Sequence, residues 1–116
     1  MWKIPEKSMY KLGRRYEYRA IKLLEQFGYT CTRSASSQGL WDVVGVRFDE
    51  VKLVQVKFTS ADKYYEDANC KEFRNLPVPD CVVKELWVFR PRRKPEIINM
   101  HGSKKKGDTA NERVES

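Results

Sequence analysis

Three side chains that could do metal or acid-base chemistry lie near the ends of two neighbouring apolar segments. Residues 41–48 and 51–59 are rich in β-branched and aromatic residues, which predicts two strands. Asp42 lies at the start of the first segment, and Gln55 and Lys57 lie near the end of the second. A carboxylate, an amide and an ammonium group beside an apolar surface need partners, because burial without partners would cost several kcal/mol.

The two predicted strands form a hairpin if the chain turns at positions 49–50. Pairing about that turn places Asp42 opposite Lys57 and Val44 opposite Gln55. One face then carries Asp42, Val44, Val46, Phe48, Val51, Leu53, Gln55 and Lys57, and is polar only at its far end. The diagonal neighbours Asp42 and Gln55 would lie roughly 7–8 Å apart at Cα, within reach of a shared ion. A salt bridge between Asp42 and Lys57 is the alternative interpretation, but it leaves Gln55 unexplained.

Glu17, on the first predicted helix, is a fourth candidate. A helical wheel places it at the edge of the apolar side, so it could lean toward the sheet, although alone it is more typical of a solvated glutamate. Hard cations such as Mg²⁺ prefer oxygen ligands, which Glu17, Asp42, Gln55 and the backbone carbonyl of Val56 could supply. Such an ion would activate a water for phosphodiester hydrolysis. Lys57 could orient that water or stabilise the pentacovalent phosphate.

The elements around these residues predict an α/β fold. Apolar residues recur at steps of three and four over residues 8–27, which predicts an amphipathic helix with Ser8 as N-cap and Gly28 at its end. The other predicted elements are a strand at 29–33, a loop at 34–40, a second helix at 61–76, a strand at 81–90 and a short strand at 96–100. The order α-β-β-β-α-β predicts a mixed β-sheet flanked by helices.

The composition favours a single domain, at residues 1–101, followed by a basic and disordered tail at 102–116. Lys and Arg number 23 against 16 Asp and Glu, for a net charge of +7. That balance favours a polyanion such as nucleic acid, with general solubility as the alternative. No apolar run predicts a membrane span, no secretory signal is evident, and the three cysteines form no CxxC pair. We therefore expect an intracellular protein with reduced cysteines, in the cytoplasm or, if encoded by a virus, in the host cytoplasm.

Basic residues crowd the first predicted helix and the segment just before it. They are Lys3, Lys7, Lys11, Arg14, Arg15, Arg19 and Lys22. This face could bind DNA phosphates, or it could simply be solvated. Arg90 and the basic residues at 92–94 could extend the same surface.

Four segments together resemble the archaeal-type Holliday junction resolvases of the PD-(D/E)XK nuclease superfamily. They are G-R-R-Y-E-Y-R-A-I-K-L-L-E-Q-F-G-Y at 13–29, R-S-A-S-S at 33–37, W-D-V-V-G-V at 41–46 and L-V-Q-V-K at 53–57. The resemblance covers about half of the chain, and it implies a restriction-endonuclease-like sheet. It also implies a homodimer that makes paired nicks in a four-way DNA junction with Mg²⁺, for which Mn²⁺ should substitute. The alternatives are a related nuclease of linear or single-stranded DNA, and a catalytically weakened DNA-binding relative.

The resemblance also implies roles for individual residues. It implies that Glu17, Asp42 and the residue at 55 bind the metal and that Lys57 is catalytic. A loop serine, Ser37 or otherwise Ser36, would approach the cut phosphate, and Arg33 would contact a phosphate. Two positions depart from the family: Gln55 replaces the usual glutamate, which should weaken metal binding, and Tyr18 replaces a frequent arginine, for which Arg14, Arg15 or Arg19 could substitute.

Overall fold

The computed structural model describes residues 6–34 and 39–101, with side chains from residue 12 onward. The predicted tail at 102–116 lies outside these residues. The elements are α1 (Glu6–Glu25), β1 (Thr30–Arg33), β2 (Val43–Arg47), β3 (Glu50–Phe58), α2 (Ala68–Asn75), β4 (Val82–Phe89) and β5 (Glu96–Asn99). The predicted α/β fold is therefore confirmed, including the short last strand.

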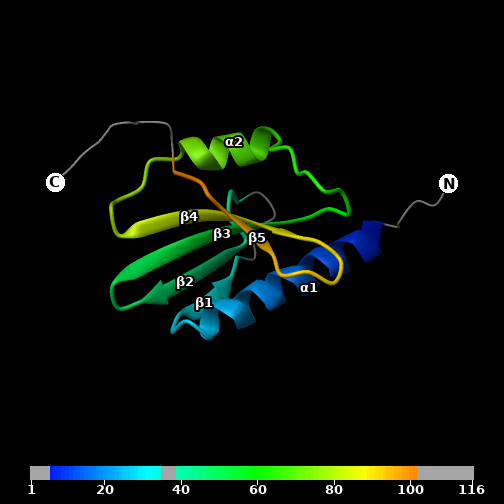
Figure 1. Ribbon diagram of the computed structural model, residues 1–116. Coiled ribbons are helices and arrows are strands. Elements are labelled where there is room, and N and C mark those ends of the chain that lie inside the picture. The colour runs from blue at the N-terminus through cyan, green and yellow to red at the C-terminus, as the bar shows by residue number, and fades with distance from the viewer. Residues whose placement is uncertain (1–5, 35–38, 102–116) are drawn as a thin grey trace.

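The strands form one mixed sheet in the order β1-β2-β3-β4-β5. Neighbouring strands are antiparallel except for β3 and β4, which run parallel. Parallel strands need a crossover connection, and the segment containing α2 provides it. The carboxyl ends of β1 and β3 and the start of β2 consequently meet at one end of the sheet (Figure 1).

Helix α1 covers one face of the sheet. Its buried residues Tyr16, Ala20 and Leu24 recur at steps of four, which places them on one side of the helix. They pack against Tyr29, just before β1, and against the buried strand residues Val43, Val54, Trp87 and Phe89. The helix begins two residues before the predicted start at residue 8 and ends two residues before the predicted end at residue 27. Ser8 therefore lies within the helix, and the prediction that it is the N-cap is wrong. Gly28 adopts a φ of +90°, a conformation that suits glycine best, and lets the chain reverse into β1.

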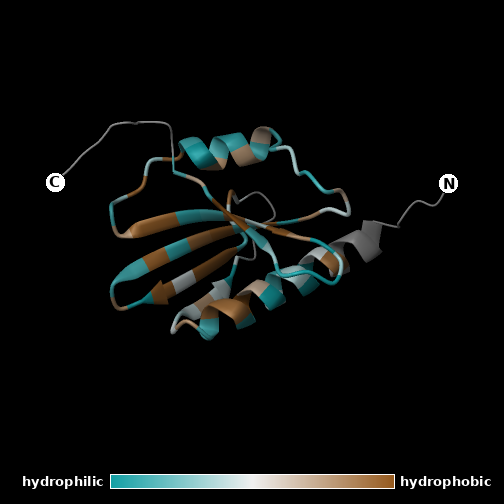
Figure 2. Ribbon diagram, in the orientation of Figure 1, coloured by the Kyte–Doolittle hydropathy of each residue, from teal (hydrophilic) through white to brown (hydrophobic). Residues whose placement is uncertain are grey.

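Helix α2 covers the opposite face (Figure 1). Its buried residues Cys70 and Phe73 pack against Leu53, Leu86, Val88 and Met100. The central strands are therefore apolar on both faces, and Figure 2 shows bands of hydrophobic residues along β2, β3 and β4. None of the described helices is both long enough and apolar enough to cross a membrane.

The β2–β3 hairpin differs from its predicted register by two residues. Val46 pairs with Val51 and Arg47 with Glu50, whereas the prediction placed Phe48 opposite Val51. Phe48 instead lies in the turn, where it is 97% exposed. Since side chains alternate with a period of two, this shift leaves the ladder residues on their predicted faces. Continued beyond the pair of Val43 with Val54, the observed register brings Asp42 level with position 55 and not with position 57.

The second helix is shorter than predicted, because residues 61–67 are not helical. The buried side chain of Arg90 holds this segment: Nε donates to the carbonyl of Ala61 over 2.7 Å, and Nη2 to that of Asp62 over 2.9 Å. A helix would need those carbonyls for its own hydrogen bonds. The prediction that Arg90 extends a DNA surface is therefore wrong, since Arg90 fastens β4 to the segment that leads into α2.

Candidate active site

Asp42 is fixed at three points where β2 begins. Its backbone N–H donates to the carbonyl of Val54 over 2.8 Å, and its carbonyl accepts from the N–H of Ser34 over 2.7 Å. Its Oδ2 accepts from the N–H of Val56 over 2.8 Å. The carboxylate therefore lies at the end of the sheet between β1 and β3. The N–H and carbonyl of one strand residue point to the same side, so the carbonyl of Val56 also points toward Asp42.

Glu17 reaches this region from α1 and pairs with Arg33 at the end of β1. The Nη1 atom of Arg33 lies 3.2 Å from Oε1 of Glu17, and both side chains are mostly buried. The guanidinium of Arg33 also lies 5.5 Å from the ring centre of Tyr18. Arg33, predicted as a phosphate contact, is thus held beside a candidate metal ligand.

The carboxyl groups of Glu17 and Asp42 both have raised pKa values. Burial raises the pKa of Glu17 above its ordinary value, and the nearby charge of Asp42 raises that pKa further, while Arg33 and Arg14 oppose the shift. Burial also raises the pKa of Asp42, although the N–H of Val56 and the charge of Lys57 oppose that shift. Two partly buried carboxylates with raised pKa values form a place where a cation would be stabilised.

Gln55 lies on the face of the sheet that α2 covers, and it is only 2% exposed. Its Nε2 donates to the backbone carbonyl of Leu40 over 2.9 Å and also to Oδ1 of Asn69 on α2. Its Oε1 is buried, and no described residue donates a hydrogen bond to it. Gln55 is therefore anchored through its nitrogen and keeps its oxygen as an unused acceptor.

Lys57 lies on the same strand face and pairs with Asp67, whose Oδ2 lies 3.5 Å from Nζ. Asp67 also begins α2 as its N-cap, since Oδ1 accepts from the N–H of Cys70 over 2.9 Å. The start of α2 therefore contacts both predicted strand residues, through Asp67 and through Asn69. Neither Asp67 nor Asn69 was predicted from the sequence, although an Asp before a helix is a recognisable N-cap signal.

The structure thus joins the predicted residues only in part. The charge of Asp42 raises the pKa of Glu17, and the charge of Lys57 opposes the rise in the pKa of Asp42. Gln55 and Glu17, however, approach from opposite faces of the sheet. Among the described residues, no three His, Cys, Asp or Glu side chains form a group that could hold a metal ion. Any shared metal site would therefore depend on Gln55 or on backbone oxygens as well as the two carboxylates.

The predicted DNA contacts on α1 differ in their surroundings. Arg15 and Arg19 are exposed, and Arg14 is half-buried. The guanidinium of Arg19 lies 5.3 Å from the ring centre of Phe89, at the carboxyl end of β4. Ser36 and Ser37 lie outside the described residues.

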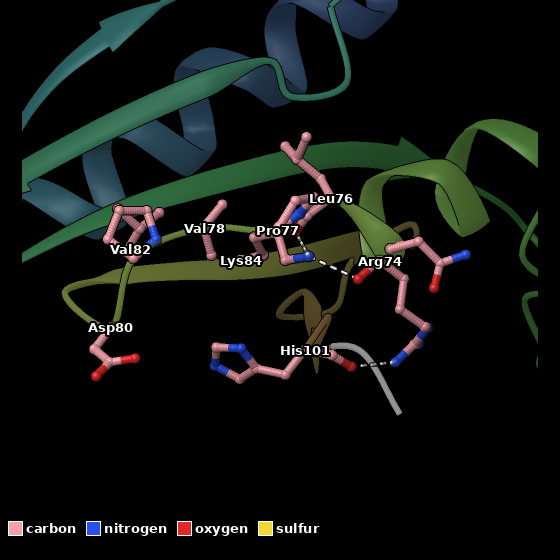
Figure 3. Close-up of a pocket in the computed structure, with 10 residues that line it drawn as sticks. Arg74, Leu76, Pro77, Val78, Asp80, Val82, Lys84 and His101 are labelled. Carbon is pink, nitrogen blue, oxygen red and sulfur yellow. Dashed lines mark hydrogen bonds between the residues drawn. The ribbon is translucent and has the colours of Figure 1, made fainter. Parts of the chain in front are cut away.

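A cavity of about 480 Å³ lies elsewhere, beside the carboxyl end of α2, and none of the candidate site residues lines it (Figure 3). Its most buried polar side chain is Lys84, whose Nζ donates to the carbonyls of Phe73, Arg74 and Leu76 over 2.9, 2.6 and 2.5 Å. These carbonyls end α2, so Lys84 closes the helix as a C-terminal cap.

A mixed sheet of this order, with α1 on one face and α2 on the other, is a resolvase-like fold. Among solved structures, the chain is similar to Hjc of Archaeoglobus fulgidus, described as a Holliday junction resolvase from an archaeal hyperthermophile. The TM-score is 0.65 and the identity 17%, over 76% of this chain and 72% of that one. No family model and no curated protein matches the chain. At this identity, the likeness shows the fold alone.

Proposed function

We propose that this protein is a structure-selective endonuclease that resolves four-way DNA junctions by paired, Mg²⁺-dependent hydrolysis of phosphodiester bonds. The observation that carries the proposal is the convergence of Glu17 and Asp42 at the end of β1, where the side chain of Arg33 binds Glu17 over 3.2 Å and the N–H of Ser34 binds the carbonyl of Asp42 over 2.7 Å. The pKa values of both carboxyl groups are raised there, and the sheet that carries them is similar to that of a resolvase. Perturbed carboxylates of this kind are typical of sites where charge is handled during catalysis.

The oxygen atoms around Asp42 suit a hard divalent cation. Glu17 and Asp42 would supply carboxylates, Gln55 its unused Oε1, and Val56 its backbone carbonyl. When bound, the ion would lower the pKa of a coordinated water and offset charge on the phosphate. In the structure Arg33 balances the charge of Glu17. This ion pair would therefore have to break when a cation binds to Glu17.

Lys57 would act on the phosphate itself. Its ammonium group is close enough to Asp42 to oppose the rise that burial causes in the pKa of that carboxyl group. In the proposed reaction a water oxygen gives up a proton to solvent and forms a bond to phosphorus, while the bond from phosphorus to the leaving sugar oxygen breaks and that oxygen takes up a proton. A fixed ammonium group stabilises the negative charge that develops on the phosphoryl oxygens. Asp67, which now pairs with Lys57 over 3.5 Å, would keep the side chain extended toward the end of the sheet.

The basic side chains of α1 would bind the junction arms. Arg14, Arg15 and Arg19 lie along the helix that carries Glu17, so their phosphate contacts would bring the DNA backbone toward that residue. Paired nicks need two active sites, and we therefore propose a homodimer. The net charge of +7 supports binding to a polyanion.

A cleavage assay with two substrates tests the proposal. A labelled four-way junction and a linear duplex of the same arm sequences are incubated with the protein and Mg²⁺, and the products are separated on a denaturing gel. We expect symmetric nicks in two opposed strands of the junction and no cutting of the duplex. The Asp42→Asn variant should bind the junction without cutting it. Equal cutting of both substrates would instead indicate a nuclease of linear DNA.

A catalytically weakened DNA-binding relative is the second candidate. It is favoured by Gln55, which supplies no negative charge, and by the lack of any three-residue acidic group among the described residues. The same assay separates the two functions. Junction binding with no cleavage by either the wild type or the Asp42→Asn variant would support the binding protein and contradict the enzyme.

A further inference from the structure

The side-chain amide of Gln55 has a defined orientation. Both of its hydrogens are used, one by the carbonyl of Leu40 at 2.9 Å and the other by Oδ1 of Asn69. A backbone carbonyl can only accept, so the nitrogen must face Leu40, and Oε1 must face the other way. Asn69 could turn its own amide, but the carbonyl of Leu40 could not become a donor.

The two acceptors also explain why an amide occupies position 55. A glutamate there would place a carboxylate oxygen against the carbonyl of Leu40, with no hydrogen between them. Leu40 lies two residues before Asp42, so this bond also ties the entry to β2 to β3. Asn69 adds α2 to the same connection.

We propose that Asn69 and the carbonyl of Leu40 are positioning groups that hold the Gln55 amide so that its buried Oε1 is presented as a neutral ligand for a divalent cation. This inference rests on the proposed function, because it gives Gln55 its role in that site. Asn69 is a positioning residue and touches neither the ion nor the DNA. Oε1 would add a third side-chain oxygen to those of Glu17 and Asp42, and the amide nitrogen satisfies the carbonyl of Leu40, which a carboxylate at position 55 could not do.

Binding of Mn²⁺ to the DNA-free protein, measured by electron paramagnetic resonance, tests the energetic part. We expect Asn69→Ala to weaken Mn²⁺ binding about 10- to 100-fold, as loss of an outer-shell partner typically does. Asn75→Ala is the matched control, because it removes an asparagine from the far end of the same helix. It should leave the affinity unchanged. Gln55→Glu should bind Mn²⁺ no more tightly than the wild type, despite its added charge.

Two results in that titration would overturn the inference. One is tighter Mn²⁺ binding by Gln55→Glu, and the other is an equal effect of Asn69→Ala and Asn75→Ala. Circular dichroism of each variant establishes that the helices have formed. Alanine is a better helix former than asparagine, so neither alanine variant should lose α2.

A nuclear magnetic resonance measurement tests the positioning without any metal. We expect both side-chain N–H signals of Gln55, assigned from their loss in Gln55→Glu, to exchange slowly with solvent in the wild type and faster in Asn69→Ala. Rapid exchange in the wild type contradicts the positioning inference, whatever the metal does. If exchange is slow but the protein binds no Mn²⁺, the amide of Gln55 is anchored as inferred but is not a metal ligand. That result would also contradict the metal site of the proposed function.

Discussion

Arg33 reaches from the end of β1 to Glu17 on α1, with Nη1 3.2 Å from Oε1. The guanidinium therefore occupies the carboxylate that the proposed site would use to bind a cation. A DNA phosphate would compete for the same guanidinium, because arginine binds phosphate and carboxylate with similar geometry. Release of Arg33 by DNA would then leave Glu17 available to a metal ion.

This competition predicts opposite effects of Arg33→Ala on the two ligands. Mn²⁺ should bind the DNA-free variant more tightly than the wild type, because no guanidinium competes for Glu17. Junction DNA should bind more weakly, with the salt dependence of binding reduced by about one ion, as for one lost phosphate contact. The control is Arg47→Ala, which removes an arginine paired with Asp49 at the β2–β3 turn. If both variants bind Mn²⁺ equally well, Arg33 does not compete at Glu17.

Asp42 should lower the stability of the metal-free protein at neutral pH. Its pKa is raised on folding, chiefly by burial, so the unfolded chain loses this proton at a lower pH than the folded chain does. Stability therefore falls as pH rises from the unfolded pKa, about 3.9, toward the higher folded pKa, and stays reduced above it. Asp42→Asn removes this loss and keeps an oxygen to accept the N–H of Val56.

Thermal melts in buffer without metal test this. We expect Asp42→Asn to melt at a higher temperature than the wild type at about pH 7 and at nearly the same temperature at about pH 3.5. Adding Mg²⁺ should raise the melting temperature of the wild type more than that of the variant, because only a ligand that binds the folded state stabilises it. A variant that is less stable at every pH would show that the carboxylate is satisfied without a cation.

Asp67 has two separable roles, as N-cap of α2 and as the partner of Lys57. Asp67→Ala should lower the free energy of unfolding by about 1 kcal/mol, the usual effect of losing an N-cap. Asp67→Asn should preserve stability, since asparagine is also a good N-cap. It removes only the ion pair, so any change in cleavage by this variant reports on Lys57. Chemical denaturation measures the first effect, and equal destabilisation by both variants would contradict the capping role.

The pKa of Asp67 predicts when the cap is lost. The hydrogen bond from the N–H of Cys70 is the main reason that this pKa lies below its ordinary value. A lowered pKa means that the stabilisation is present above the unfolded pKa, about 3.9, and disappears as pH falls through the folded value. The stability difference between the wild type and Asp67→Ala should therefore shrink in strong acid.

Lys57→Ala should reduce junction cleavage about 10²- to 10³-fold while leaving junction binding close to that of the wild type, because one stabilising charge is lost from the reaction and not from the DNA-binding face. Single-turnover cleavage and a gel-shift titration measure the two quantities. Lys63→Ala is the control, since Lys63 is an exposed lysine in the segment before α2. Equal losses of cleavage in both variants would assign the effect to overall charge.

Much of the fold follows from local pattern. The apolar steps of three and four along the first helix predicted the side of α1 that is buried, which carries Tyr16, Ala20 and Leu24. Alternation also assigned Gln55 and Lys57 to one face of the sheet. That assignment stayed correct although the predicted register was wrong by two residues, because side chains on a strand alternate with a period of two. A residue's own side chain and its near neighbours are enough to decide such features.

The tertiary structure decided what depends on pairing between distant segments. Arg90 removes residues 61–67 from the predicted helix by binding two of their carbonyls, and Gln55 is oriented by Leu40 and Asn69, 15 and 14 residues away along the chain. Neither contact can be predicted from a periodic pattern in the sequence. Each is a hydrogen bond between groups far apart along the chain, which come together only when the sheet and α2 pack. The residue types around position 42 indicated metal chemistry from the sequence, whereas packing determined that Glu17 approaches from one face of the sheet and Gln55 from the other.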